Sequence, residues 1–233
     1  MTKKSVRVWT VVVSALFMAA GLLAQSGAYT LAVAEDAEQQ VLVDKAVVTV
    51  NNFMADPDMT WLRSNIKNAQ GVLIIPSLVK AGFVFGGSGG RGVLLVRDEA
   101  QRVWGEPAFY SVGSVSWGLQ IGLESSEVIM LVRTRKGLDS LLTSSLKLGA
   151  DASVAAGPVG AGAKATTADI LSFARAKGAF AGLSLEGAVV KTNDDWNSTY
   201  YGTAVRPIDI LVKKSVKNPG SVKLREAVGK AAQ

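Results

Sequence analysis

The chain has 233 residues, of which 48% are hydrophobic and 19% are charged, and its formal net charge is +6. This balance is typical of a packed globular protein and not of a disordered one. The chain contains no cysteine and no histidine, which excludes a Ser-His-Asp or Cys-His nucleophile, a zinc finger and an iron–sulfur cluster. Only carboxylate and carbonyl oxygens remain as metal ligands, and these suit Ca²⁺ or Mg²⁺.

Residues 1–34 have the pattern of a secretory signal peptide. Basic residues occur within positions 3–7, an uncharged apolar stretch follows over residues 8–24, and small residues lead up to Ala28 and Ala34. Cleavage after Ala34 is favoured; cleavage after Ala28 and retention as a membrane anchor are the alternatives. Removing the segment leaves 22 basic and 19 acidic residues, a net charge of +3. This small excess does not indicate nucleic-acid binding.

Helices are expected at both ends of the remaining chain, over residues 35–70 and 206–233. Between residues 35 and 54, apolar residues recur at helical spacing. Asp56, Pro57 and Asp58 then provide a cap, a first-turn proline and an acidic first turn for a second helix. The last helix is expected over residues 221–231. The apolar positions of the first helix are Leu42, Ala46, Val50 and Phe53.

The central part, residues 71–205, is expected to form a curved antiparallel sheet or a small β-barrel. Short apolar runs separated by glycine are typical of such folds. The glycine-rich stretch 86–92 is interpreted as the tip of a hairpin, and a short helix is expected over residues 135–143. Strands are expected at 72–75 (closed by Pro76), 82–85, 93–96, 117–124, 128–132, 146–156, 159–165, 170–176 and 180–190. The expected fold class is therefore α+β, with one domain over residues 35–233.

Several motif matches are interpreted as structural. Residues 87–92 fit the dinucleotide pattern G-x-G-x-x-G but lead into a strand, whereas that motif must open a helix. Residues 86–90 fit the G-x-S-x-G elbow, which needs a histidine that the chain lacks. Residues 193–197 combine two carboxylates with two amides, too few acids for a calcium loop, and are interpreted as a turn. Three carboxylates are interpreted as solvent-facing charges on strands and not as a glycosidase pair: Glu124, Glu127 and Asp151.

Longer segments between residues 71 and 211 resemble the SYLF domain, also called the YSC-type actin-binding domain. They are residues 80–87 with 89–92, 104–108, 118–122, 148–160, 178–187, and Asn197 with 200–202. The resemblance implies a lipid-binding domain without enzymatic activity and without a cofactor. In eukaryotic adapters such domains are associated with phosphoinositide membranes and, in fungi, with actin; bacterial relatives are exported. Ala161 stands where an arginine is expected, and Phe173-Ala174 where Tyr-Ser is usual.

The expected function is peripheral binding of anionic phospholipid or phosphoinositide-like head groups in the bacterial cell envelope, after export to the periplasm or outside. Each lysine or arginine near an anionic surface contributes about 1 kcal/mol. Actin would not be present in that compartment, and no nucleic acid is expected as a partner. The candidate lipid-binding residues are Lys45, Arg63, Lys67, Lys80 and Arg91.

Two alternatives stay open. The first is an envelope scaffold that binds a protein partner through a loop surface, because aromatic residues in loops are typical of interfaces. The second is a carrier that holds an apolar ligand inside a barrel. The sequence also leaves open whether the first helix inserts into a membrane or packs as core. The candidate interaction-loop residues are Gly87, Gly89, Gly90, Trp196 and Tyr200.

Overall fold

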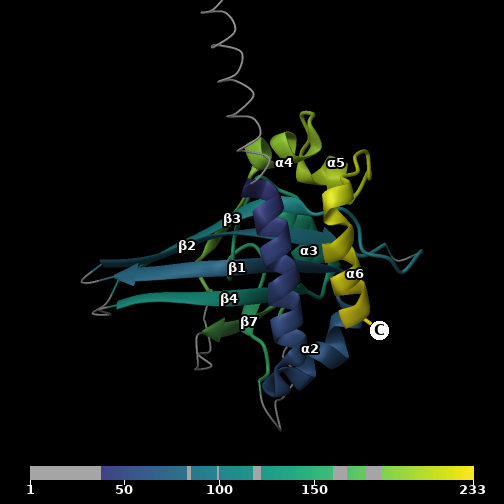
Figure 1. Cartoon of the computed structure of the whole chain (residues 1–233). Helices are drawn as coiled ribbons and strands as arrows, with labels where there is room; N and C mark the ends of the chain where they lie inside the picture. The colour runs from purple at the N-terminus through teal and green to yellow at the C-terminus, as the bar shows by residue number, and fades with distance from the viewer. Residues whose placement is uncertain (1–37, 83–84, 99, 118–121, 160–166, 177–184) are drawn as a thin grey trace, which may run out of the picture. The chain divides into compact units, whose positions relative to one another are not determined.

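A computed structural model of the chain describes residues 38–82, 85–98, 100–117, 122–159, 167–176 and 185–233. The chain divides into two compact units, residues 1–39 and residues 40–233. The second unit holds nearly all of the described residues, and it is an α+β fold as predicted (Figure 1). The predicted signal peptide, residues 1–34, lies outside the described residues.

The second unit is built on one eight-stranded sheet with the order β5-β8-β3-β2-β1-β4-β7-β6. The paired strands are antiparallel except for β6 and β7, which are parallel. The sheet is therefore mixed and not purely antiparallel. The strands are β1 (Gly71–Gly82), β2 (Phe85–Val96), β3 (Ala108–Trp117), β4 (Gly122–Val132), β5 (Ser145–Lys147), β6 (Val154–Ala156), β7 (Ile170–Ala176) and β8 (Val189–Thr192).

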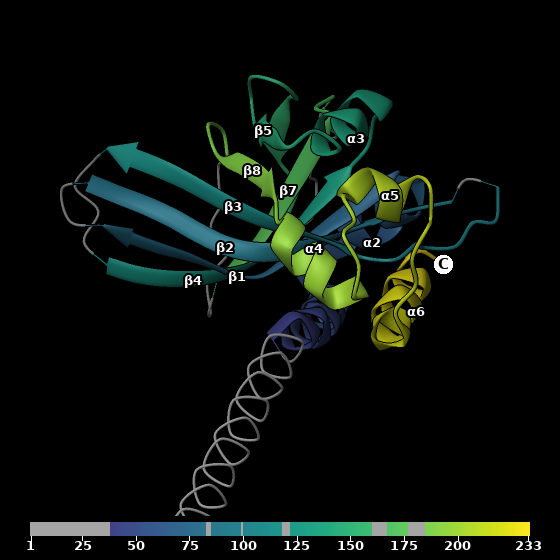
Figure 2. The ribbon, with the colours of Figure 1, turned by 90° about the horizontal axis from the view of Figure 1, so that it is seen from above.

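Helices lie on both sides of the central strands. Figure 2 shows the helix of residues 38–55 and α6 (Val222–Ala231) on one side, and α3 (Arg135–Leu141) with β5 on the other. Both terminal helical regions were predicted, and the structure confirms them. The remaining helices of the described residues are η1 (Pro57–Met59), α2 (Thr60–Asn65), η2 (Ile66–Asn68), α4 (Asp194–Tyr201), α5 (Pro207–Leu211) and η3 (Pro219–Ser221). Among the described residues, no helix combines the length and apolarity needed to span a bilayer.

Helix 38–55 packs as core on the sheet. Val43, Ala46, Val50 and Phe53 are fully buried in one cluster with Val72 and other residues of the sheet. Burying a side chain of the size of Phe53 contributes roughly 1.5–3 kcal/mol. The apolar stripe predicted from the sequence is therefore used for internal packing in this structure.

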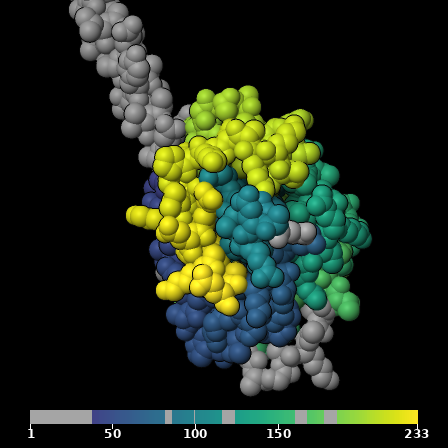
Figure 3. All heavy atoms as spheres, turned by 90° about the vertical axis from the view of Figure 1, so that its right-hand side faces the viewer, coloured from purple at the N-terminus to yellow at the C-terminus, as the bar shows by residue number. Residues whose placement is uncertain are grey.

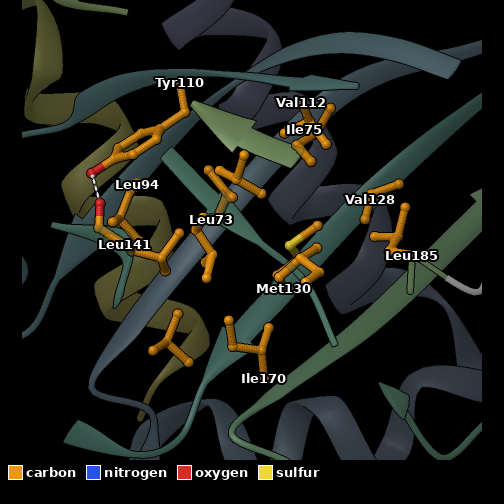
Figure 4. Close-up of a cluster of buried hydrophobic side chains, with 14 of the residues drawn as sticks. Leu73, Ile75, Leu94, Tyr110, Val112, Val128, Met130, Leu141, Ile170 and Leu185 are labelled. Atoms are coloured by element: carbon orange, nitrogen blue, oxygen red, sulfur yellow. Dashed lines mark hydrogen bonds between the residues drawn. The ribbon is translucent and has the colours of Figure 1, made fainter. Parts of the chain in front are cut away.

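The opposite face of the sheet holds a second cluster of buried hydrophobic side chains. The sheet curls, so its two ends enclose this cluster. Figure 4 shows Leu73, Ile75 and Met130 packed together there, with Ile170 from β7 beside them. The Tyr110 hydroxyl donates a hydrogen bond of 2.8 Å to a backbone carbonyl of α3. Among the described residues, these buried side chains occupy the face of the sheet on which a carrier would hold its apolar ligand.

The glycine-rich stretch 86–92 is not a hairpin tip, and that prediction is wrong. These residues lie within β2, and residues 83–84, between β1 and β2, lie outside the described residues. The register of β1 shifts between Ile74 and Ser77, at Pro76, so β1 continues to Gly82 instead of ending at the proline. A Cβ atom on Gly90 or Gly92 would lie 2.5 or 2.6 Å from a carbonyl oxygen of β1. The glycines therefore allow the close backbone approach at this bulge.

Two other assignments also differ. Residues 117–124 are not one strand, because β3 ends at Trp117 and β4 begins at Gly122, and these two strands run in opposite directions. Residues 193–197 are not a simple turn: Asn193 caps α4, and its side chain accepts a hydrogen bond of 3.3 Å from the Trp196 amide. Asn197 is fully buried, where its side chain accepts a 2.8 Å hydrogen bond from the Phe109 amide. Parts of the strands predicted at 159–165 and 180–190 lie outside the described residues.

Candidate anion-binding cleft

A cleft of about 880 Å³ opens between η2, the segment that follows β2, and α6. Figure 3 shows the face where these segments meet, with α6 in yellow, the segment near residue 100 in teal and the region of α2 and η2 in blue. The cleft is lined by Lys67, Asn68, Arg97, Arg102, Val103, Trp104, Val222, Arg225, Glu226, Gly229, Ala232 and Gln233.

The floor of the cleft is fixed by Arg225 of α6. Its Nε donates to the Trp104 carbonyl at 2.9 Å, and its Nη1 donates to Glu106 Oε1 at 3.0 Å. Trp104 and Glu106 are both buried. Because Glu106 neutralises Arg225, this arginine contributes shape and rigidity to the cleft more than free charge.

Arg97 brings a second guanidinium to the cleft at the end of β2. Its Nη1 donates to the Lys67 carbonyl, and its backbone amide donates to the Gln70 carbonyl at 2.9 Å. Its Nε is buried and has no hydrogen-bond partner among the described residues. A buried donor without a partner is unfavourable, so a ligand oxygen that reached this nitrogen would stabilise it.

Arg102 lies on a tight turn at the rim. Its φ of +56° is in the left-handed region, which is unfavourable for residues with a Cβ. Asp98 holds the turn, because its Oδ1 accepts hydrogen bonds of 2.9 Å from the amides of Ala100 and Gln101 and its other oxygen pairs with Lys214. The Lys214 ammonium, followed by these amides, lowers the pKa of the Asp98 carboxyl. The turn thus fixes the backbone of an exposed arginine beside the recess.

The charges in the cleft are strongly unbalanced. Lys67, Arg97, Arg102 and Arg225 face one carboxylate side chain among the described lining residues, that of Glu226. Because Glu106 neutralises Arg225, three cations, those of Lys67, Arg97 and Arg102, remain against the carboxylate of Glu226. Clefts lined by one sign of charge concentrate ligands of the opposite sign. The arrangement therefore suits an anion, and guanidinium groups match the oxygens of phosphate or carboxylate.

The structure does not gather the five predicted lipid-binding cations into one patch. Lys67 lines the cleft, whereas Lys45 lies exposed on helix 38–55. Lys80 lies on β1 directly opposite Glu124 of β4.

Two of those five cations have structural partners. Arg63 donates to the Asp56 carbonyl and, at 3.0 Å, to Thr60 Oγ1, so it stabilises the connection between the first two helices. The guanidinium of Arg91 lies 4.4 Å from the centre of the Trp196 ring, a cation–π contact.

The predicted interaction loop is also not a loop. Gly87, Gly89 and Gly90 lie within β2, and Trp196 and Tyr200 lie on α4. Tyr200 is buried, with its ring 5.0 Å from that of Phe109. Burial raises the pKa of its hydroxyl. The loop assignment is wrong because the aromatic residues at positions 196, 200 and 201 have helical spacing; contact of these residues with a partner stays a prediction.

Sequence reasoning missed Arg97, Arg102, Trp104 and Arg225. The first three lie more than 120 residues before the end of the chain, and only the fold brings them to α6. One signal was available: residues 206–233 contain seven basic and two acidic side chains. A count of charge by segment would have directed attention to the C-terminal helix. The described residues contain no cluster of three or more acidic side chains suited to a metal ion.

Comparisons with known proteins identify the family. Residues 113–231 match the Ysc84 family, which is described as Las17-binding protein actin regulator. The chain belongs to this family. The SYLF resemblance predicted from the sequence is thus confirmed. The matched region contains Arg225 and α6 but begins after Lys67, Arg97 and Arg102.

The similar proteins are longer than this chain. The SH3 domain-containing protein PJ696.02 of Schizosaccharomyces pombe is 34% identical over 59% of this chain and 34% of its own length. LAS seventeen-binding protein 3 of Saccharomyces cerevisiae is 30% identical over 59% of this chain and 31% of its own length. SH3 domain-containing YSC84-like protein 1 of Homo sapiens is 29% identical over 66% of this chain and 46% of its own length. The chain thus spans about a third to a half of these relatives. No solved structure matches the chain.

Proposed function

We propose that the chain is a non-enzymatic protein that attaches peripherally to anionic lipid surfaces, with the cleft holding a phosphate-bearing head group. One observation carries this proposal: Lys67, Arg97, Arg102 and Arg225, from three separate segments, converge on a single recess. Its volume of about 880 Å³ lies within the range of small-ligand sites. Its cations can contact several oxygens of one head group at the same time.

The rim of the cleft adds an apolar component. Val103 and Val222 are 47% and 43% exposed, although both are apolar. These side chains can contact the glycerol or upper acyl region of a lipid whose head group lies in the cleft. Contact with apolar surface contributes roughly 25 cal/mol per Å², so the valines favour a lipid over a free phosphate ion.

The expected affinity is modest. Three cations without internal neutralisation give about 3 kcal/mol at an anionic surface, at about 1 kcal/mol each. Arg225 is omitted because Glu106 pairs with it. Salt screens exposed charges at this range, so binding should weaken as ionic strength rises.

Vesicle co-sedimentation of the full chain tests this function. Phosphatidylcholine vesicles with and without phosphatidylglycerol are compared at low and high salt. Arg102→Glu replaces an attraction of about 1 kcal/mol with a similar repulsion, which lowers the partition coefficient roughly 30-fold. Lys67→Glu should act in the same direction. Lys147→Glu is the matched control, because Lys147 is exposed on β5 and outside the cleft lining.

The proposal is supported if Arg102→Glu and Lys67→Glu lose vesicle binding while Lys147→Glu retains it. Equal binding by all variants, or equal binding to vesicles with and without phosphatidylglycerol, contradicts it. Inorganic phosphate added as a competitor distinguishes the ligand source. If the ligand is a lipid, phosphate should release the protein from vesicles no more than sodium chloride of the same ionic strength does. Complete release of the protein by phosphate alone would indicate a site for a free anion.

Export to the bacterial cell envelope, in the periplasm or outside the cell, forms part of the same proposal. The basic start, apolar stretch and small residues of residues 1–34 support it. Mass spectrometry of the protein from an expressing bacterium measures the mature N-terminus. A chain that begins at Glu35 supports export with cleavage after Ala34, and one that begins at Tyr29 supports cleavage after Ala28. An intact N-terminus contradicts cleavage.

A protein partner is the second candidate, favoured by the family description of Las17 binding. The similar proteins are longer than this chain, so binding of the same partners by this chain is a proposal. A partner that binds without lipid, and equally well to Lys67→Glu and Arg102→Glu, would favour this candidate over the lipid surface.

A further inference from the structure

The short helix α5 is apolar on two sides. On its inner side, Pro207, Ile210 and Leu211 are buried in the fold. On its outer side, Ile208 and Val212 lie one turn apart and are 38% and 46% exposed. A helix that is apolar all round is normally enclosed by protein or by lipid. The outer side of α5 therefore presents apolar surface that the described part of the chain does not cover.

The chain around this helix is basic. Residues 206–217 contain four basic side chains and one acidic side chain, that of Asp209, a net charge of +3. Asp209 is already engaged, because one oxygen accepts from the Lys213 ammonium at 2.7 Å and the other from the Arg206 amide at 3.1 Å. Lys217 is exposed and makes no ion pair within the described residues. The apolar outer side of α5 thus belongs to a positively charged segment.

Two basic residues with unusual backbone conformations connect this segment to the rim of the cleft. Among the described residues, Arg102 and Lys214 are the non-glycine residues with positive φ, +56° and +54°. Such conformations are unfavourable for residues with a Cβ and are typical of functional sites. One carboxylate oxygen of Asp98 holds the Arg102 turn through the amides of Ala100 and Gln101, and the other pairs with Lys214. The cleft rim and the segment after α5 are therefore fixed to each other.

The segments that carry exposed aliphatic side chains meet on one face of this unit. Figure 3 shows the region of α5 in yellow-green, the segment near residue 100 in teal and α6 in yellow on the same face. Val103 and Val222, at the rim of the cleft, are 47% and 43% exposed. Together with Ile208 and Val212, they give the surroundings of the cleft four exposed aliphatic side chains.

We propose that this face, from α5 to the rim of the cleft, is the surface that lies on the bilayer, with Ile208 and Val212 inserted at the level of the lipid head groups. The inference rests on the proposed attachment to anionic lipid and adds the side of the protein that meets the membrane. The positive charge around α5 complements an anionic bilayer surface. The cleft opens on the same face, so a lipid whose head group enters it stays in its own leaflet.

The composition of the face favours lipid over a protein partner. The core of a protein interface is enriched in aromatic residues and depleted in lysine. Here the exposed apolar side chains are one isoleucine and three valines, and the neighbouring cations of the α5 segment are mainly lysines. Apolar side chains flanked by basic ones are typical of surfaces that lie in the membrane interface. The occupant that fits this face is therefore an anionic bilayer.

A fluorescent label tests which side of the protein meets the bilayer. The chain has no cysteine, so Val212→Cys provides a single site for a nitrobenzoxadiazole label, whose emission shifts to shorter wavelength in apolar surroundings. We expect this shift when phosphatidylcholine vesicles that contain phosphatidylglycerol are added to the full chain. Val115→Cys is the matched control, because Val115 is 83% exposed on β3, whose outer end points away from α6 in Figures 1 and 2. Its label should not shift.

A second pair of variants measures how much the insertion contributes. Val212→Gln should lower the vesicle partition coefficient about tenfold. The loss should persist at high salt, because salt screens charges and not apolar contacts. Val115→Gln should bind as the wild type does. Both side chains are exposed, so both variants should keep the fold.

The outcomes separate this inference from the cleft. If the chain binds vesicles while the label at residue 212 stays unshifted, or if Val212→Gln binds as the wild type does, the inference is overturned and the cleft proposal stands. A shift at residue 212 with unchanged binding by Lys67→Glu and Arg102→Glu supports the membrane-facing side and contradicts the cleft.

Three further results would overturn the inference. Equal shifts at residues 212 and 115 would show that the protein has no preferred side toward the bilayer. A shift at residue 212 with soluble polyglutamate, and none with vesicles, would indicate an acidic protein partner. A wild-type chain that binds no vesicles would overturn this inference together with the proposed function.

Discussion

The same four strands behave differently at their two ends. The inner halves of β1, β2 and β4 carry mainly valine, leucine and isoleucine, and that of β3 carries Ala108, Phe109 and Tyr110; these residues are buried on both faces. The outer halves are richer in glycine and serine and expose apolar residues such as Val79 and Val115, and helix 38–55 and α6 do not reach their ends. The backbone ladder is continuous across the boundary. Hydrogen bonding thus defines the strands, whereas side-chain volume decides which part of the sheet becomes core.

The largest effect should come from removing core volume under helix 38–55. Phe53→Ala should lower the free energy of unfolding by about 3–5 kcal/mol, because Phe53 is fully buried and its loss leaves a cavity. Val115→Ala, in the outer half of β3, should change the free energy of unfolding by less than about 0.5 kcal/mol. Urea unfolding at low protein concentration measures both. Similar losses in the two variants would contradict the division of the sheet.

Glycine substitutions sharpen the comparison within one strand. Gly92→Ala should destabilise the protein by about 1–3 kcal/mol, because its Cβ would lie 2.6 Å from the Ile74 carbonyl oxygen. Gly89→Ala, three residues earlier, should be neutral or stabilising by up to about 1 kcal/mol. Melting temperatures of the two variants test this. A destabilised Gly89→Ala would show that an internal contact requires that glycine.

An ion-pair network joins helix 38–55 to the sheet at the boundary between the inner and outer halves of the strands. Glu127 accepts hydrogen bonds from Thr49 at 3.1 Å and Asn52 at 2.9 Å on helix 38–55, and from Arg175 at 3.0 Å; Arg175 also contacts Asp56 at 3.2 Å. Arg175→Met should cost about 1–3 kcal/mol, because it leaves two partly buried carboxylates without their cation.

Arg135→Met is the control for that variant. Arg135 pairs with Asp139 at 2.9 Å, but both side chains are more than half exposed. Its loss should cost less than about 1 kcal/mol. Equal losses for Arg135→Met and Arg175→Met, measured by urea unfolding, would show that the network does not fasten the helix to the sheet.

The smallest expected effect is a change in the pH dependence of the stability of the fold, through Asp169. Hydrogen bonds from Thr134 and then Ser153 lower the pKa of Asp169 from 3.8 to about 2. Because the folded-state pKa is the lower one, Asp169 stabilises the fold above about pH 4, and this contribution is lost as the pH falls toward 2. The difference in melting temperature between wild type and Asp169→Asn should therefore be largest near neutral pH and shrink on acidification. A constant difference would contradict this assignment.

Sequence patterns predicted the elements whose packing is local. The stripe Leu42, Ala46, Val50 and Phe53 indicated helix 38–55, and the run 170–176 matches β7. The role of residues 86–92 could not be predicted, because it depends on a register shift near Pro76 in a different strand. The cleft could not be predicted because Arg97 and Arg225 are distant in sequence and meet only in the folded chain.

The central functional claim is that the cleft recognises an anionic lipid head group. The most direct test is a nuclear magnetic resonance titration of the ¹⁵N-labelled full chain with short-chain, monomeric phosphatidylglycerol. We predict that the amide signals of Lys67, Arg97, Arg102 and Arg225 shift together, with one dissociation constant, while those of Lys45 and Lys191 stay unchanged. Shifts spread over exposed lysines throughout the surface, or no shift among the cleft residues, would contradict the claim.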